Sequence, residues 1–505
     1  MARAGTFNLV LRDDRYDSVF TASDKLHQRL KRVRAARAAA GAKNPAPTFA
    51  DIDATHTLHL RARYKPYVAT TCEYMRTKSS GAAATLGETA GTTATFTFQS
   101  YGTFTADMVF HVRFGALGSE TAAASDPRYR FCAYPGMRLF ERVEFKSAST
   151  LLDDYTADEV SFANKFEVAA DRRAAWDRGM GQAPSKRATF FNENGFTGVL
   201  EYRDGLQTPK TYHAPADLWV PAQFAFNRDA AHALLNDLIP NSQRTVVVEL
   251  ATLAKLVQAS DRTTGAAVAL PISTLPVTID LYVNSIFVNP EVADIFTSRI
   301  GYDLFRVHRR QVLRLTSTGE SLKLSQLKYP LEYAYAGFRS TANADSFDQW
   351  HLFGKARART SATSLLAATC IWNSTVSACQ LACRTATEAD CLDPVLSTLK
   401  FTAHGIDLYP DLPASFYSDY LPQRFFAGTL VTAAADTSAL LVNFNLYPGV
   451  DAPSGYYNLS AGRELYLTYT AAAASSADPI EAVVSASALN FIVNKGDTCA
   501  LRYSL

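Results

Sequence analysis

Four cysteines within 22 residues form the densest group of potentially reactive side chains in this sequence. They are Cys370, Cys379, Cys383 and Cys391. Zinc sites favour cysteine pairs separated by two to four residues, and only Cys379 and Cys383 have that spacing. We therefore predict free thiols at these positions, with one or two disulfides as the second alternative and a zinc site as the third.

Histidines and carboxylates are the next candidates for chemistry. His56 and His59 lie near one predicted strand, but their odd spacing places them on opposite faces, so they would not share a metal there. His404 is isolated beside a glycine, which favours a structural role over a catalytic one. Asp153 and Asp154 are adjacent. Neighbouring strand residues point apart, which predicts a solvated corner here and not a catalytic carboxylate pair.

Motifs that would supply a phosphate loop, a dinucleotide turn or a zinc-protease helix do not occur in the sequence. The segment "APSGYYNLS", 452–460, holds a serine, Ser454, without the glycine-flanked elbow of a hydrolase. Asn458 and Asn373 each begin a glycosylation sequon, which is used only in a secretory compartment. We predict an architectural corner at 452–460. We also predict no catalytic, cofactor-binding or metal-ligating residue in the chain.

Bulk composition favours a large, non-secreted protein. At 505 residues the chain exceeds the usual size of one hydrophobic core, so about two domains are expected. No secretory signal and no apolar run of transmembrane length is evident. The odd number of cysteines, seven, argues against a disulfide framework. The isolated cysteines Cys72, Cys132 and Cys499 are predicted to be small core residues.

The charge is concentrated in an N-terminal arm. Residues 1–43 hold ten basic and four acidic residues, a net charge of +6 in a chain whose total is +2. Residues 21–40 predict a helix with Leu26, Leu30 and Val33 on one face, ended by "NPAP". This helix lacks interleaved aromatic residues, so we expect no sequence-specific nucleic acid partner. A phosphate- or lipid-facing tether and a simple solvated helix remain equal alternatives.

After the arm, apolar and polar residues alternate in many short segments separated by proline, glycine and asparagine. Leu440, Val442, Phe444 and Leu446 are one example, and Leu465, Leu467 and Tyr469 continue the pattern after the corner. Other examples are "RLFERVEF" (138–145), "TVVVEL" (245–250) and "VTIDLYV" (277–283). Period-2 alternation predicts strands with one buried face, so the fold class should be all-β, built as sandwiches or barrels.

An internal repeat divides the chain. Segment 143–159 resembles 399–419, and the strand–turn–strand segment 218–250 resembles 440–469. From the spacing we predict a basic arm (1–47), a first sandwich (48–260), a linker (261–276) and a second sandwich (277–505). Each sandwich carries one long insertion without regular strands, at about 172–210 in the first and about 343–398 in the second.

Many collinear segments resemble the major capsid proteins of large nucleocytoplasmic DNA viruses, in particular the asfarvirus-like group of African swine fever virus. The corner at 452–460 resembles the Pro-Ser-Gly-x-x-Asn-x-Ser corner of their second jelly roll. The other matching segments are "THTLHLRARYKPYV" (55–68), "YPGMRLFERVEF" (134–145), "QTPKTYHAPADLWV" (207–220), "LYVNSIFVNPEV" (281–292), "RVHRRQV" (306–312), "LKYPLEYAYAGF" (327–338), "TAHGIDL" (402–408) and "VVSASALNFIV" (483–493).

The resemblance implies a double jelly roll, with two eight-stranded sandwiches and a short N-terminal helical arm. It implies a structural, non-enzymatic protein that forms homotrimers of pseudo-hexagonal outline, and these tile the icosahedral outer shell of a virion assembled in the host cytoplasm. The insertions would form towers on the outer face. The arm would lie on the inner face, near the inner viral membrane or acidic inner proteins. Minor capsid proteins, neighbouring capsomers and a viral folding chaperone are the other implied partners.

Two rival functions use the same kind of scaffold. A carbohydrate-active or metal-dependent jelly-roll enzyme would need clustered histidine and glutamate ligands on its strands, and the sequence shows no such cluster. A glycan-binding adhesin would need an export signal, which is also not evident. The capsid function is therefore the prediction, and a jelly-roll glycan-binding or carbohydrate-active protein is the alternative.

Overall fold

The computed structural model describes residues 24–41, 70–80, 85–88, 92–99, 102–121, 126–183, 185–192, 195–203, 205–239, 244–262, 266–288, 302–356, 365–373, 378–386, 392–425, 438–450, 452–459, 464–471, 474–495 and 498–503. The chain divides into two units. One, here called the arm unit, comprises residues 1–71 and 287–296, and the other, the sandwich unit, comprises 72–286 and 297–505.

The arm unit contains the predicted basic helix. Helix α3 spans Asp24–Ala39, and the side chains of Lys31, Arg32 and Arg34 on it are exposed. The predicted apolar stripe of this helix lies outside the described side chains. The predicted break at 44–47 and the histidines His56 and His59 lie outside the described residues.

The first jelly roll consists of two antiparallel sheets whose central strands follow the orders β1-β17-β4-β12 and β3-β14-β7-β8. The eight strands are β1 (Thr70–Lys78), β3 (Thr92–Thr97), β4 (Phe104–Phe114), β7 (Phe140–Ser147), β8 (Thr150–Thr156), β12 (Ala216–Pro221), β14 (Arg244–Leu250) and β17 (Leu275–Val288). Lettered B to I in chain order, they form sheets B-I-D-G and C-H-E-F, the arrangement of a jelly roll. The short strands β2 (Thr85–Leu86) and β13 (Leu234–Leu235) extend the first sheet.

The second jelly roll repeats the same orders, as β18-β30-β20-β27 and β19-β29-β25-β26. Its strands are β18 (Tyr302–Leu315), β19 (Gly319–Lys323), β20 (Pro330–Ser340), β25 (Leu396–Ala403), β26 (Ile406–Pro413), β27 (Ala439–Asn443), β29 (Leu465–Ala471) and β30 (Ile480–Lys495). The strands β28 (Tyr457–Asn458) and β31 (Thr498–Leu501) add to the first of these sheets. The all-β double jelly roll predicted from the sequence is therefore confirmed.

The position of the domain boundary is corrected by the strand pairing. The predicted opening strand of the second sandwich, 277–283, lies in β17 and pairs with β4, Val277 opposite Phe114. It is the last strand of the first jelly roll, and the second begins with β18. The predicted linker 261–276 is also wrong, because β16 (Ala267–Val268) pairs with β15 (Val257–Ser260), which in turn pairs with β6 (Arg128–Phe131).

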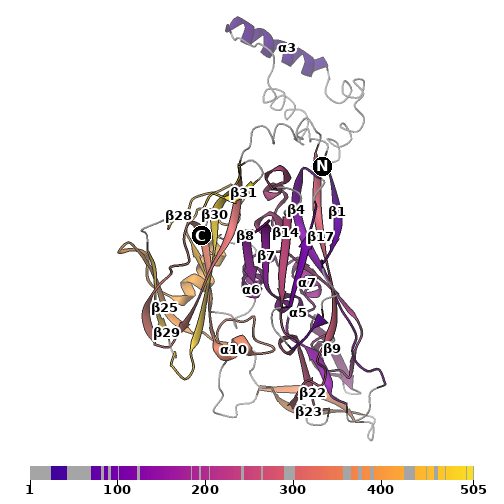
Figure 1. The fold of residues 1–505 in the computed structure, drawn as a ribbon. Helices are drawn as coiled ribbons and strands as arrows, with labels where there is room; N and C mark the ends of the chain where they lie inside the picture. Colours follow the sequence, from indigo (N-terminus) through magenta and orange to yellow (C-terminus); the bar gives the residue numbers. More distant parts are fainter. Residues whose placement is uncertain are drawn as a thin grey trace. The chain divides into compact units, whose positions relative to one another are not determined.

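Both predicted insertions contain a hairpin, where the sequence suggested irregular loops. In the first, β9 (Ser185–Asn192) pairs with β10 (Gly195–Arg203), and in the second, β22 (Leu365–Asn373) pairs with β23 (Ala378–Ala386). Strand β10 approaches β22, and both hairpins lie at the same end of the sandwich unit (Figure 1). Two smaller pairs flank them, β5 (Leu117–Gly118) with β11 (Tyr212–His213) and β21 (Lys355–Ala356) with β24 (Leu392–Asp393).

Short helices occupy the connections of the sandwich unit. They are α5 (Pro135–Leu139), α6 (Ala157–Phe166), α7 (Arg173–Gly179), η1 (Ala225–Asn227), η2 (Ala230–His232), η3 (Asn236–Leu238), α8 (Leu253–Leu256), α10 (Thr341–Asp345), η5 (Phe416–Tyr420) and α11 (Leu421–Phe425). No helix in the described part of the chain is long and apolar enough to cross a membrane. Helix α6 and the pair η5–α11 each follow the F strand of their jelly roll.

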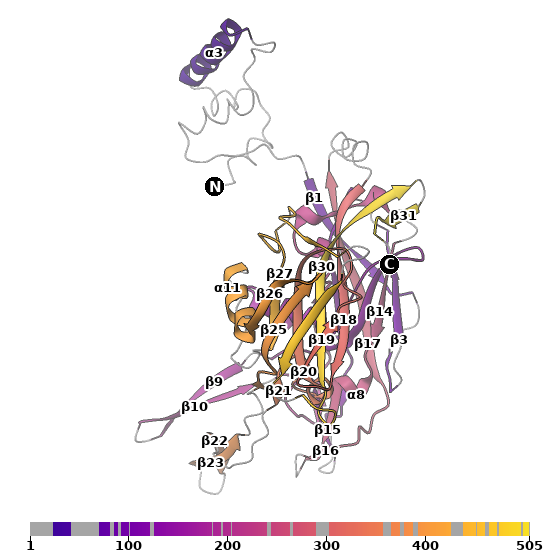
Figure 2. The same cartoon turned by 90° about the vertical axis from the view of Figure 1, so that its left-hand side faces the viewer.

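The four main sheets stack face to face across the sandwich unit. In Figure 1 the order runs from β25 and β29, through β30, to β7, β8 and β14, and then to β4, β17 and β1. Figure 2 views the stack from the β25 side, with the second jelly roll in front. Within the first sandwich the core is aromatic, with Phe96, Phe110 and Phe145 fully buried. Burying each such ring stabilises the fold by about 1.5–3 kcal/mol relative to exposure.

Candidate functional site

The corner at 452–460 is architectural in the structure, as predicted. The Ser454 hydroxyl accepts from the backbone N–H of Tyr447 (2.8 Å) and donates to the Tyr447 carbonyl (3.2 Å). Gly455 has φ +128°, a conformation that L side chains rarely adopt. Of the flanking strands, β29 alternates as predicted, whereas β27 is buried on both faces and Leu446 is exposed. Helices η5 and α11 contact β27, which explains its second buried face.

The other predicted site residues that the structure describes do not lie together at one place. His404 is exposed at the β25–β26 turn with φ +55°, which fits the structural role predicted for it. Among the described residues, no group of three or more histidine, cysteine, aspartate or glutamate side chains could hold a metal ion. Cys391 and the side chains of Cys370, Cys379 and Cys383 lie outside what the structure describes, so their prediction stays open.

The three isolated cysteines differ from one another. Cys132 and Cys499 are buried, as predicted, and burial raises the pKa of their thiols to about 12 and about 11. Cys72 is exposed on β1, so its assignment to the core is wrong. Strand β1 is the edge strand of its sheet and is exposed along most of its length, which explains the difference.

Asp153 and Asp154 point to opposite sides of β8, as predicted, but they do not form a solvated corner. Asp154 pairs with Arg142 at 3.0 Å. Asp153 is fully buried, where its two carboxylate oxygens accept from the backbone N–H (2.8 Å) and Nδ1 (2.9 Å) of His308. Strand β18 of the second jelly roll carries His308, so Asp153 joins the two sandwiches. This contact lies in the seam between the jelly rolls.

Helix α6 is the central element of this seam. Thr156 caps it, with its backbone N–H donating to Glu159 (2.8 Å) in a capping box. The helix presents two buried rings to the second jelly roll. Phe162 stacks on Tyr335 of β20 with ring centroids 5.5 Å apart, and Phe166 stacks on the same ring at 4.9 Å. Phe162 also stacks on Phe353, at 4.7 Å and nearly parallel.

Ion pairs surround these aromatic contacts. Arg339 of β20 pairs with Asp158 of α6 (2.8 Å) and with Glu481 of β30 (3.0 Å). Burial alone would lower the pKa of Arg339, but the two carboxylates raise it overall. Glu167, just after α6, accepts from Arg228 (2.8 Å) and from the Tyr335 hydroxyl (2.9 Å). Burial and the neighbouring Glu167 raise the Tyr335 pKa well above its ordinary value. Groups held this way fix the two surfaces together.

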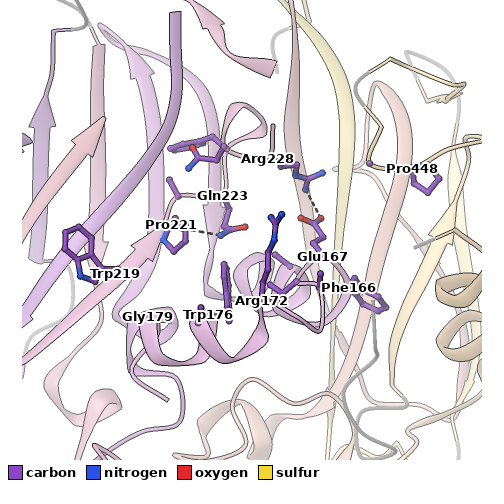
Figure 3. A pocket seen from close by; sticks show the side chains of 18 of the residues that line it. Phe166, Glu167, Arg172, Trp176, Gly179, Trp219, Pro221, Gln223, Arg228 and Pro448 are labelled. Atoms are coloured by element: carbon purple, nitrogen blue, oxygen red, sulfur yellow. Dashed lines mark hydrogen bonds and ion pairs between the residues drawn. The ribbon is translucent and has the colours of Figure 1, made fainter. Parts of the chain in front are cut away.

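A cavity of about 770 Å³ opens beside α6 (Figure 3). Its walls come from α6, α7 and β12 of the first jelly roll and from the turn at Pro448 in the second. Figure 3 shows the Glu167–Arg228 pair at one side and the indole of Trp219 at the far edge. No nucleophile with an adjacent base is among the residues lining the described cavity.

An aromatic cluster lies on the outer face of the B-I-D-G sheet of the first jelly roll. Trp219 of β12 stacks on His111 of β4 with centroids 4.2 Å apart, and Tyr282 of β17 lies 5.6 Å from Trp219. His111 also contacts Asp217, at 3.0 Å. The indole of Trp219 is 45% exposed. Sequence reasoning did not single out these residues, although strand alternation places His111 opposite the buried Phe110 and Val112.

The contact of His308 with Asp153 in the seam should make the stability of the protein depend on pH. Burial lowers the pKa of His308, but Asp153 and Glu159 outweigh it and raise the pKa overall, with Arg228 opposing them. A histidine whose pKa is raised in the folded state stabilises the fold fully at pH values below its ordinary pKa of about 6.5. This stabilisation is lost as the pH rises through the folded-state pKa.

We therefore expect the difference in melting temperature between the wild type and His308→Gln to be largest at acidic pH and to shrink above neutrality. Thermal unfolding of both proteins between pH 5.5 and 8.5 measures this difference. Burial lowers the pKa of His213, which acts in the opposite direction, but that contribution is common to both proteins and cancels. A difference that grows with pH would contradict the assignment.

Comparisons with known proteins find relatives that match this chain over its full length. No protein-family model matches the chain. The hexon protein p72 of African swine fever virus (isolate Tick/Malawi/Lil 20-1/1983) is 26% identical over 655 aligned positions that cover both chains completely. The major capsid protein of isolate Warthog/Namibia/Wart80/1980 shows the same identity and coverage.

Solved structures show the same relationship. The Faustovirus major capsid protein is 26% identical, with a TM-score of 0.72 over 95% of this chain and 100% of that one. A chain of the PBCV-1 virus capsid is 18% identical, with a TM-score of 0.59 over 88% and 99%, and supports the fold alone. Full-length similarity and a duplicated B-to-I sheet order lead to one conclusion: the chain is similar over its whole length to major capsid proteins of large DNA viruses and shares their double jelly-roll fold.

Proposed function

We propose that three copies of this chain close into a capsomer of pseudo-hexagonal outline, and that these capsomers tile an icosahedral shell. The observation that supports this most is the duplicated sheet order within one chain. Three chains would present six similar sandwiches, so that a three-fold ring approximates a six-fold one. The chain's contribution is structural, through the stacked sheets and their faces, and no enzymatic step is part of the proposal.

Molecular mass and shape test this function. Purified protein should elute at about three times the chain mass of 55.2 kDa, and negative-stain electron microscopy should show hexagonal particles. A protein that stays monomeric at all accessible concentrations would overturn the proposal. We further propose that the hairpins β9–β10 and β22–β23 form the outer towers and that assembly takes place in the host cytoplasm. Minor capsid proteins and a viral folding chaperone are the other proposed partners.

The basic arm is proposed to act in assembly, on the inner face of the shell. Helix α3 belongs to the arm unit and exposes Lys31, Arg32 and Arg34. Such charges would attract anionic lipid of an inner membrane or acidic inner proteins, over a Debye length of about 8 Å at physiological salt.

Deleting residues 1–43 should therefore leave trimers with an unchanged melting temperature but prevent shell formation. Replacing Lys31, Arg32 and Arg34 with glutamate should reproduce the assembly defect. The control variant keeps the positive charges, with arginine at position 31 and lysine at positions 32 and 34, and should assemble normally. Electron microscopy of assembly reactions and thermal unfolding of the free trimers are the two measurements. If the truncated chain forms no trimers, the arm is part of the trimer fold and its proposed function fails.

A further inference from the structure

The cavity beside α6 has the size and the lining of a small-molecule site. Its volume of about 770 Å³ falls within the range of about 300–1,000 Å³ that is usual for such sites. Most of its lining residues are apolar, and the aromatic ones include Phe166, Trp176, Phe224 and Phe425. Phe425 belongs to α11 of the second jelly roll, and the other three belong to the first. A ligand in this cavity would therefore contact both jelly rolls.

One face of helix α7 forms a wall of the cavity. The lining residues from this helix and its N-cap are Arg172, Ala175, Trp176 and Gly179. They recur at i, i+3, i+4 and i+7, the spacing that places side chains on one face of a helix. Figure 3 shows the side chains of Arg172 and Trp176 extending from the helix toward the side of the cavity that holds Glu167. The polar ends of these two side chains are thus available to a ligand.

Three polar groups in the lining have no partner among the described residues. The indole Nε1 of Trp176 and the Oδ1 of Asn227 are buried, and neither forms a hydrogen bond. The Asn227 amide is fixed, because its Nδ2 donates to the Met108 carbonyl at 2.7 Å. The guanidinium of Arg172 also forms no hydrogen bond or ion pair in this part of the chain. Buried polar groups are normally satisfied, so these atoms indicate two donors and one acceptor for a bound molecule.

The lining also carries an excess of positive charge. Its charged residues are Glu167, Arg172 and Arg228. Glu167 and Arg228 neutralise each other at 2.8 Å, which leaves the charge of Arg172 uncompensated. A guanidinium presents several N–H donors in a planar fork that matches a carboxylate. The cavity is therefore suited to a mostly apolar molecule that carries one anionic group.

We propose that this cavity binds an amphipathic carboxylic acid of the N-acyl amino acid class. Its carboxylate accepts from the Arg172 guanidinium and from the Trp176 indole N–H. Its amide N–H donates to the Oδ1 of Asn227, and its acyl chain lies against the aromatic wall. This site goes beyond the structural role proposed above, because it gives the chain a small-molecule ligand.

The charge of the site is tested with 1-anilinonaphthalene-8-sulfonate, a fluorescent probe that has an apolar body, an anionic group and an N–H donor. Fluorescence titration of the full-length protein should show saturable binding. Arg172→Gln should weaken this binding about tenfold, because it removes a charge-assisted hydrogen bond. Arg178→Gln is the matched control, since Arg178 lies on the same helix but does not line the cavity. Its affinity for the probe should equal that of the wild type.

The space in the site is tested by filling it. Ala175 and Ala174 are neighbouring exposed residues of α7, and only Ala175 lines the cavity. Ala175→Trp should reduce probe binding at least tenfold, because the larger side chain occupies the position of the ligand. Ala174→Trp should bind the probe as the wild type does. Unchanged near-ultraviolet circular dichroism shows that each variant folds.

Competition identifies the chemical class of the ligand. N-dodecanoylglycine, at concentrations below those at which it forms micelles, should displace the probe and raise the melting temperature of the wild type, because it binds the folded protein. Dodecyltrimethylammonium has the same chain length and the opposite charge, and its displacement should need at least tenfold higher concentrations. Equal competition by the two compounds would overturn the inference, as would equal probe binding by the wild type, Arg172→Gln and Ala175→Trp. Either result would leave the proposed capsomer standing, since molecular mass and particle shape test that function separately.

Discussion

Replacing Arg339 with methionine should lower the free energy of unfolding by about 3–5 kcal/mol, because it leaves two mostly buried carboxylates without their shared cation. Arg339 connects Asp158 of the first jelly roll with Glu481 of the second, and it also donates to the Trp350 carbonyl (2.9 Å). Its side chain is only 7% exposed, so solvent screens these interactions weakly. Chemical denaturation of the purified protein measures the loss.

Two further variants define the cause of that loss. Lys323→Met removes a cation from an exposed pair with Glu464 and should leave stability nearly unchanged, because exposed pairs contribute little. Combining Arg339→Met with Asp158→Asn and Glu481→Gln removes all three charges and should recover most of the loss. If the triple variant is as unstable as Arg339→Met alone, packing and not charge explains the effect.

The sequence predicts the architecture well because strand alternation is a local signal that survives without knowledge of pairing. The repeat of 218–250 in 440–469 coincides with the G and H strands of both jelly rolls, β12 and β14 in the first and β27 and β29 in the second. The boundary was misplaced for a related reason. The first and last strands of a jelly roll lie side by side in one sheet, as β1 and β17 do. Alternation alone therefore does not assign 277–283 to one sandwich or the other.

The seam was missed because its contacts are not local. Asp153 and His308 are 155 positions apart, and only the folded stack of sheets brings them together. Helix α6 has a signal that could have been found, the Thr156-x-x-Glu159 capping box ahead of an apolar pair. The aromatic cluster around His111 has no comparable signal, because only the strand order brings its rings together.

Gly337 and Phe353 provide the second prediction with a large effect. Phe353 is fully buried between Phe162 of α6 and the backbone of β20 at Gly337. Phe353→Ala should cost about 3–5 kcal/mol of unfolding free energy, since it removes a buried ring and leaves a cavity in the seam. Leu446→Ala, at an exposed position of the second jelly roll, is the control and should change stability by less than about 0.5 kcal/mol.

Gly337→Ala should also be destabilising, because a Cβ atom at this position would lie 2.3 Å from the Phe353 ring, well inside van der Waals contact. The cost of the alanine should therefore depend on the ring. In the Phe353→Ala background the clash is absent, so adding Gly337→Ala should cost little or restore part of the lost packing. The two effects should be strongly non-additive in a double-mutant cycle measured by chemical denaturation. Additive losses would mean that Gly337 serves the conformation of β20 itself and does not make room for the ring that joins α6 to the second jelly roll.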